Sequence, residues 1–300
     1  MTFPRLLITG TALAALTVFV GATHSQEQPR QPRWAPRIQI VFRPDVSISP
    51  TIDLRPEIKR LGLAIRDQGN NRGTCSVFAT TFLIEYHDAR TNNLRNLDLS
   101  EEYLNWAKNR ANNTDFDGGF FTDIIRGYQE FGMVPIKDMP YLAAFLPKHP
   151  DAPTKPVIDL GKKFERYPFT FIKQWDNQNG MSEKELEATK AALKTGRPVA
   201  TGVWWLQNVE TVTVNHVPLL KEYPRKDNNN SDPSKNPMFD GHSIDLVGFH
   251  EGKEFPGGGY FIFRNSFGVG FGEDGYGFIS FRYIRNYSND AIYIESKESI

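Results

Sequence analysis

Apolar side chains recur at three- and four-residue spacing in the stretch that begins at Cys75, at Phe78, Ala79, Phe82, Leu83 and Tyr86. This spacing is typical of a helix that buries one face. Because the pattern starts at Cys75, it places that residue in the first turn of the predicted helix. The pattern thus gives a thiol a defined position at a helix N-terminus.

Three more helices are predicted in the first two thirds of the chain. Ser100 and the two glutamates after it open one periodic run, and a second run covers about residues 120–131. Ser182 and Glu185 have the spacing of a capping box, which predicts a third helix that ends before Gly196.

The pattern changes after Pro198 to short β-branched or aromatic runs between glycine-rich turns. Strands are predicted at about residues 199–205, 243–249, 260–264, 276–281 and 291–295. A polar, turn-rich stretch at about 220–240 predicts an exposed loop. We therefore expect an α+β fold, with a helical subdomain at about 75–198, a β-rich subdomain at about 199–295 and a cleft between them.

The N-terminus has the pattern of an export signal. Arg5 precedes an apolar stretch that reaches about residue 20, and small residues follow at 21–25. We interpret 1–25 as a signal peptide, 26–50 as a flexible leader rich in proline, glutamine and arginine, and 51–300 as the folded domain. This predicts a secreted or periplasmic protein without a membrane segment after cleavage, with a retained anchor as the alternative.

Charge and cysteine content narrow the partners. The 35 basic and 35 acidic residues cancel, so no net field attracts nucleic acid. The single cysteine, Cys75, cannot form an internal disulfide, so stability must come from packing. No two histidines lie three or four residues apart, and we expect neither a metal nor another cofactor. The sequence does not indicate an oligomeric state.

Cys75 is a candidate nucleophile. A thiol attacks a carbonyl as the thiolate, and its usual pKa of about 8.5 falls beside a helix N-terminus or an imidazolium. Gln68 precedes Cys75 across a turn with two glycines, and its amide could donate to an oxyanion together with the Cys75 N–H. His242 lies just before an apolar strand, and Asn265 follows an aromatic one, so both could point into a cleft.

Several short motifs, in this order, resemble those of the papain-like C1 cysteine peptidases over about residues 51–295. They are the glutamine, glycine-rich turn and nucleophile in Asp67 through Cys75, the helix start at Ser100-Glu101-Glu102, Asp117-Gly118-Gly119-Phe120, Tyr141, Gly241-His242-Ser243-Ile244, and Asn265-Ser266-Phe267-Gly268 through Tyr276. The last segment matches the family pattern position for position, with phenylalanine at both tryptophan positions.

The resemblance implies a papain-like two-subdomain peptidase and a role for each matched residue. His242 would take the Cys75 proton, and Asn265 would orient the imidazole ring. Gly118 and Gly119 would hydrogen-bond an extended peptide substrate.

The sequence departs from the family at four points. Ser76 and Phe267 stand where the family has tryptophan, the spacing from Gln68 to Cys75 is one residue longer than usual, and the family's disulfides are absent.

Three other functions compete with peptide hydrolysis. The fold could serve as a binding protein with little or no activity. A Cys-His acyl transferase uses the same nucleophile, but that class usually orients its histidine with aspartate. A metal-binding protein is the third. Substrate specificity, and endopeptidase or exopeptidase action, stay open.

Overall fold

The computed structural model describes residues 49–142, 152–206, 209–223 and 238–295. The predicted signal peptide lies outside the described residues, as do all but the last two residues of the predicted leader and most of the predicted loop at 220–240.

All four predicted helices are confirmed. The helices of the described residues are α1 (Arg55–Leu61), α2 (Cys75–Thr91), α3 (Glu101–Asn112), α4 (Phe121–Phe131), η1 (Ile136–Asp138, a 3₁₀ helix), α5 (Lys155–Lys163), α6 (Glu183–Lys194) and α7 (Phe281–Tyr287). Cys75 is the first residue of α2, as predicted. Ser182 and Glu185 form the capping box of α6 in both directions, which explains why that helix begins where the sequence indicated.

The predicted strands are also confirmed, with others between them. The strands are β1 (Ile52–Asp53), β2 (Phe169–Lys173), β3 (Val199–Leu206), β4 (Thr211–Val214), β5 (Val217–Leu220), β6 (Met238–Glu251), β7 (Gly259–Arg264), β8 (Tyr276–Ser280) and β9 (Ser288–Ile294). The end of the predicted loop is wrong, because residues 238–240 belong to β6 and continue its pairing with β3.

The strands form one mixed sheet in the order β2-β9-β3-β6-β7-β8-β5-β4, and β1 also pairs with β6. Within the described residues the pairs are antiparallel, apart from the parallel pair β5 and β8. His242 lies in β6, and Asn265 directly follows the neighbouring strand β7, so the pairing of these strands brings together the two polar segments that the sequence indicated.

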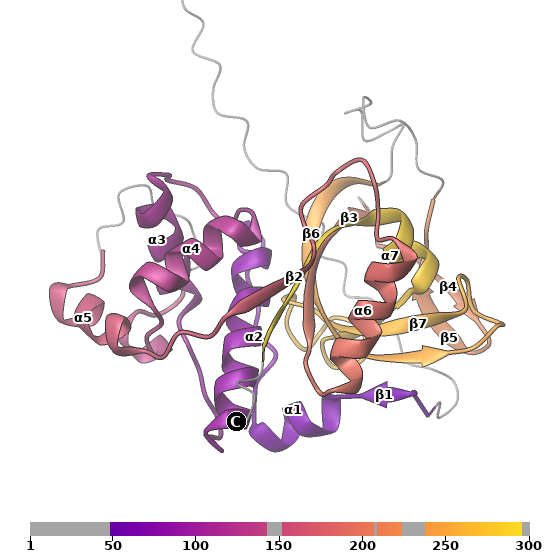
Figure 1. Cartoon of the computed structure of the whole chain (residues 1–300), viewed down its shortest axis with the longest axis horizontal. Helices are drawn as coiled ribbons and strands as arrows, with labels where there is room; N and C mark the ends of the chain where they lie inside the picture. Colours follow the sequence, from indigo (N-terminus) through magenta and orange to yellow (C-terminus); the bar gives the residue numbers. More distant parts are fainter. Residues whose placement is uncertain (1–48, 143–151, 207–208, 224–237, 296–300) are drawn as a thin grey trace, which may run out of the picture. The chain divides into compact units, whose positions relative to one another are not determined.

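Helix α2 lies where the helices meet the sheet (Figure 1). It contacts α1, α3 and α4, and it also packs against β3, β6 and β9. Of the 17 residues of α2, 13 are buried, because other elements pack around the helix, although the sequence pattern indicated one apolar face. This packing places α2, which begins at Cys75, between the other helices and the strand that carries His242. None of the helices in the described ranges is both long and apolar enough to span a bilayer.

Candidate active site

Cys75 is half-buried and lies at the N-terminus of a 17-residue helix. The first turn of α2 contains no acidic residue, so nothing within that turn offsets the positive end of the helix dipole. Thr74, the residue before it, is held by a hydrogen bond of 2.7 Å between its Oγ1 and the Tyr141 hydroxyl. The Thr74 side chain is therefore anchored beside the candidate nucleophile, and the N-terminus of a helix is a position that stabilises an anion.

His242 and Asn265 form a buried hydrogen-bonded pair. The distance from His242 Nε2 to Asn265 Oδ1 is 2.7 Å. Oδ1 also accepts a 2.8 Å hydrogen bond from the Ser266 N–H, which requires an oxygen at that position and so fixes the orientation of the amide. A carbonyl oxygen only accepts, so Nε2 carries the ring proton and Nδ1 is the nitrogen left to act as a base.

Two aromatic rings enclose the His242 ring. The ring centroid of Phe267 is 4.6 Å away at an interplanar angle of 33°, and that of Trp205 is 4.7 Å away. Burial lowers the pKa of His242 to about 4, while the hydrogen bond to Asn265 opposes this shift. The imidazole is therefore neutral at pH 7 unless an anion such as a thiolate forms beside it. Phe267 thus shields the His242 ring even though it lacks an indole. Trp205 shields the same ring from strand β3, and no pattern in the sequence indicated this contact.

Gln68 is fixed at both ends of its side-chain amide. Its Nε2 donates to the Arg72 carbonyl oxygen at 2.9 Å, and its Oε1 accepts from the Ser266 hydroxyl at 2.6 Å. The Gln68 N–H also donates to the Ser266 carbonyl oxygen at 2.9 Å. The second N–H of Nε2 could donate a hydrogen bond to an oxyanion. Ser266, which neighbours Asn265, therefore couples the candidate oxyanion donor to the histidine partner.

The two glycines of the candidate substrate-binding segment differ. Gly118 has φ +64°, and a Cβ there would lie 2.2 Å from the Gly73 carbonyl oxygen, so only glycine fits beside the turn before Cys75. Its N–H already donates to Asn105 Oδ1 at 3.1 Å. A Cβ at Gly119 would meet nothing closer than 3.8 Å. Because the Gly118 N–H already donates to Asn105, it is not available to a substrate. The groups of this segment that we expect to bind a substrate are therefore Gly119 and the Gly118 carbonyl.

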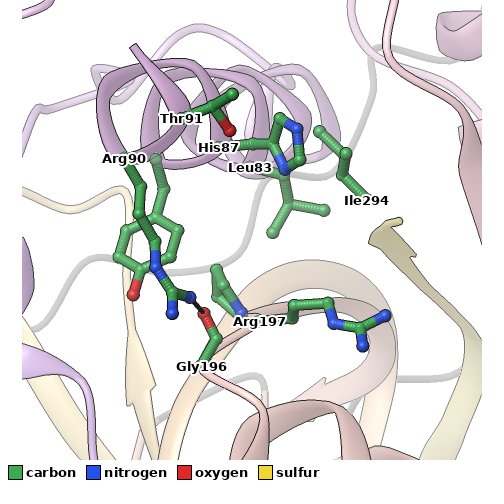
Figure 2. A pocket seen from close by; sticks show the side chains of 9 residues that line it. Leu83, His87, Arg90, Thr91, Gly196, Arg197 and Ile294 are labelled. Carbon is green, nitrogen blue, oxygen red and sulfur yellow. Dashed lines mark hydrogen bonds between the residues drawn. The ribbon is translucent and has the colours of Figure 1, made fainter. Parts of the chain in front are cut away.

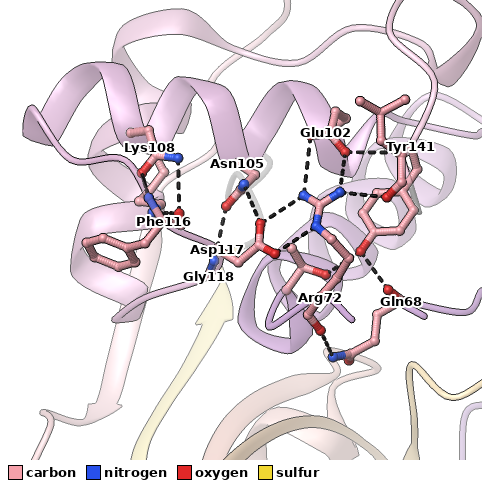
Figure 3. Close-up of polar contacts among 12 residues, drawn as sticks. Gln68, Arg72, Glu102, Asn105, Lys108, Phe116, Asp117, Gly118 and Tyr141 are labelled. Carbon is pink, nitrogen blue, oxygen red and sulfur yellow. Dashed lines mark hydrogen bonds and ion pairs between the residues drawn. The ribbon is translucent and has the colours of Figure 1, made fainter. Parts of the chain in front are cut away.

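Arg72 joins the nucleophile turn to this segment (Figure 3). Its side chain is fully buried and binds both carboxylate oxygens of Asp117, from Nε at 2.7 Å and Nη2 at 2.8 Å. Nη1 also donates to Glu102 Oε2 at 2.9 Å and to the Leu142 carbonyl at 2.6 Å. This role could not be predicted from the sequence, since an arginine in a polar turn resembles an exposed one.

A cavity of about 230 Å³ lies towards the other end of α2, between that helix and the Gly196–Pro198 turn (Figure 2). His87, Arg90 and Arg197 are among its lining residues. None of the sequence-predicted site residues lines it, so the candidate chemistry belongs to the N-terminal end of α2. Within the described ranges, no cluster of three or more histidine, cysteine or acidic residues could hold a metal ion.

The fold and the candidate site together indicate the class of cysteine peptidases. The chain belongs to the papain family of cysteine proteases, because the family model described as "Papain family cysteine protease" matches residues 48–299. The α+β two-subdomain fold is thereby confirmed.

Solved structures support the same fold. Xylellain, a cysteine protease from Xylella fastidiosa, is 20% identical with a TM-score of 0.59 and covers 89% of this chain and 95% of its own. Digestive procathepsin L 3 from the larval midgut of Tenebrio molitor is 19% identical with a TM-score of 0.55 and covers 89% of this chain and 76% of its own. A search of curated proteins finds no match.

Proposed function

We propose that this protein is an active cysteine peptidase that hydrolyses peptide bonds through an acyl-enzyme at Cys75. The observation that carries the proposal is the 2.7 Å hydrogen bond between His242 Nε2 and Asn265 Oδ1, buried under Phe267 and Trp205. An amide in that position orients a neutral imidazole, and its Nδ1 is the base that the chemistry needs.

The reaction proceeds in two halves. Nδ1 of His242 takes the thiol proton, and the Cys75 sulfur attacks the peptide carbonyl carbon. The Cys75 N–H and the Gln68 amide donate to the oxyanion while the C–N bond breaks and the imidazolium gives its proton to the leaving amine. Water then attacks the thioester with His242 as base, which releases the carboxylic acid and restores Cys75.

The substrate is a peptide or protein bound as an extended strand beside Gly119. The open side of Gly119 allows the close main-chain approach that such binding requires. The balanced charge of the chain offers no general attraction for nucleic acid. We place the mature domain at about 51–300, outside the cytoplasm, in a secreted or periplasmic setting. This rests on the export signal predicted at 1–25 and the leader predicted at 26–50.

An acyl transferase is the second candidate, and the nature of the histidine partner argues against it. Asn265 supplies an amide oxygen where that class usually has a carboxylate. Release of acid alone, in the presence of a primary amine acceptor, would favour hydrolysis over transfer.

Affinity labelling tests whether the thiol is activated. An epoxysuccinyl peptide should alkylate Cys75 of the native protein and add one mass of the reagent, because a thiolate opens the epoxide and the ring oxygen takes a proton. The His242→Ala variant should react much more slowly, and Cys75→Ala should not react. Equal labelling rates for the native and urea-unfolded wild type would contradict the proposal, because an ordinary thiol would then account for the reaction.

A second prediction concerns Gln68. Gln68→Ala should lower kcat by about 10²–10³ with little change in KM, because one oxyanion donor is lost. Ser266→Ala is the matched comparison, since it removes only the hydrogen bond to Gln68 Oε1 and should cost less. Steady-state kinetics on a fluorogenic peptide measure both. Unchanged kcat in Gln68→Ala would mean that the longer turn directs this amide away from the oxyanion.

A further inference from the structure

A small cavity adjoins the His242–Asn265 pair and is lined by residues of α2, the start of α3 and strands β6 and β7. Its volume is about 20 Å³, and its lining includes Glu101, Asp245 and Asn265. A cavity of at least about 10–15 Å³ by this measure holds one water molecule when it also offers polar partners. The space therefore suits a single ordered water.

Three of the polar side chains that line this cavity have buried atoms without a hydrogen-bond partner within the described part of the chain. These atoms are Asn265 Nδ2, Asp245 Oδ1 and both carboxyl oxygens of Glu101. All three side chains are at most 4% exposed, so bulk water does not reach them. Glu101 Oε1 has an ionic contact, at 2.7 Å from Arg66 Nη2. A side chain with an unpaired donor and two acidic side chains with unpaired acceptors line the same water-sized space, and buried polar groups are rarely left unpaired.

The surrounding charges determine the state of the two carboxyls. Arg66 Nη2 lies 2.7 Å from Glu85 Oε1 as well as from Glu101, and Arg66 also pairs with Asp98 at the rim. Arg264 donates to the carbonyls of Leu63 and Ala64 and faces Asp245 across the β6–β7 pairing. Burial raises the pKa of Glu101 to about 8 and that of Asp245 well above its usual range. Burial thus favours the neutral form of both carboxyls, while Arg66 and Arg264 oppose that shift.

We propose that this cavity holds an ordered water that accepts from Asn265 Nδ2 and binds Asp245 Oδ1, and that Asp245 is thereby a positioning residue for the His242–Asn265 pair. The proposal rests on the function proposed above, because it assigns Asp245 a part in orienting the base. Glu101 supplies the further polar atoms around the same water. Asp245 lies opposite Arg264, the residue before Asn265, so the pairing of β6 with β7 brings both ends of this link together.

The link would fix the Asn265 amide from its far side. The Ser266 N–H and His242 Nε2 both donate to Oδ1, and a water on Nδ2 would anchor the other end. Without that anchor the amide is held through Oδ1 alone, so its terminal side-chain torsion has a wider range and its hold on the imidazole is weaker. Loss of the link should therefore affect kcat, which depends on the ring orientation, and leave substrate binding unchanged.

Asp245→Leu tests the proposal, since leucine fills similar space without a polar atom. We expect kcat to fall roughly tenfold at unchanged KM, a loss typical of removing a group that orients a functional histidine. Asp245→Asn keeps an oxygen that can bind the water, so this variant should retain most of the wild-type kcat. Asp98→Asn is the matched control, because it alters the same charge cluster without lining the cavity, and it should behave as wild type.

A second readout does not need turnover. In a Cys75→Ala background, ¹⁵N NMR should find the His242 ring proton on Nε2, and Asp245→Leu should speed its exchange with solvent. A high-resolution crystal structure of the wild type should place a water within hydrogen-bond distance of Asn265 Nδ2 and Asp245. A dry cavity, or wild-type kcat and proton exchange in Asp245→Leu, would overturn the proposal. An inactive wild type that still passes the NMR and crystallographic tests would refute only the proposed peptidase function.

Discussion

Cys75→Ala is expected to lower the kcat of peptide hydrolysis by about 10⁶, the size of loss that follows when the nucleophile of a catalytic unit is removed. His242→Ala should cost nearly as much, because a nucleophile and its base act together. Asn265→Ala should cost less, since it removes a group that orients the imidazole while the base itself remains. The measurement is single-turnover and steady-state hydrolysis of a fluorogenic peptide library.

The controls separate chemistry from folding. His216→Asn replaces an exposed histidine in the turn between β4 and β5 and should keep wild-type activity. His216 has φ +69°, a conformation that asparagine tolerates. Circular dichroism should give the same spectrum for all the variants. Wild-type hydrolysis by Cys75→Ala would refute the assignment of the nucleophile, and full activity in His242→Ala would refute that of the base.

The fold could be predicted from sequence where local signals agree with packing. The 3.6-residue periodicity after Cys75 and the capping box at Ser182 each specify a helix without distant contacts. Strand β2 gave no such signal, because Phe169–Lys173 is only partly buried and depends on pairing with β9 far along the chain. The β4–β5 hairpin turns at Asn215 and His216, both with positive φ, and Asn-His is a much weaker turn signal than Asn-Gly.

The candidate site divides in the same way. Recognisable motifs contain the four candidate catalytic residues Cys75, Gln68, His242 and Asn265. The side chains that hold these residues in place could not be recognised, because each contacts a residue that is distant in sequence. Trp205 reaches His242 only because β3 pairs with β6, and the Ser266 hydroxyl holds Gln68 from 198 residues away. Sequence motifs therefore point to the candidate reacting groups, and the tertiary structure shows which side chains hold them.

Arg72→Met should destabilise the fold by about 3–5 kcal/mol, because it removes the cation from a buried ion pair and leaves Asp117 and Glu102 uncompensated. For a domain of this size that corresponds to a fall in Tm of roughly 10 °C. The side chain connects the turn that carries Gln68 to the segment that carries Gly118, so kcat should fall in the folded fraction as well. Arg72→Lys should lie between, since an ammonium cannot bind Asp117 through two parallel hydrogen bonds.

Thermal unfolding followed by circular dichroism measures the change in Tm. Two comparisons separate the loss of the buried ion pair from other effects of the substitution. Arg60→Met removes an exposed ion pair with Glu57 by the same substitution and should leave Tm nearly unchanged. Adding Asp117→Asn and Glu102→Gln to Arg72→Met should recover part of the loss, because no uncompensated buried charge then remains. If Arg72→Met had the same Tm as Arg60→Met, the buried ion-pair network would not be what stabilises the turn before Cys75. Loss of stability without recovery in the triple variant would instead mean that the shape and hydrogen bonds of the guanidinium matter more than its charge.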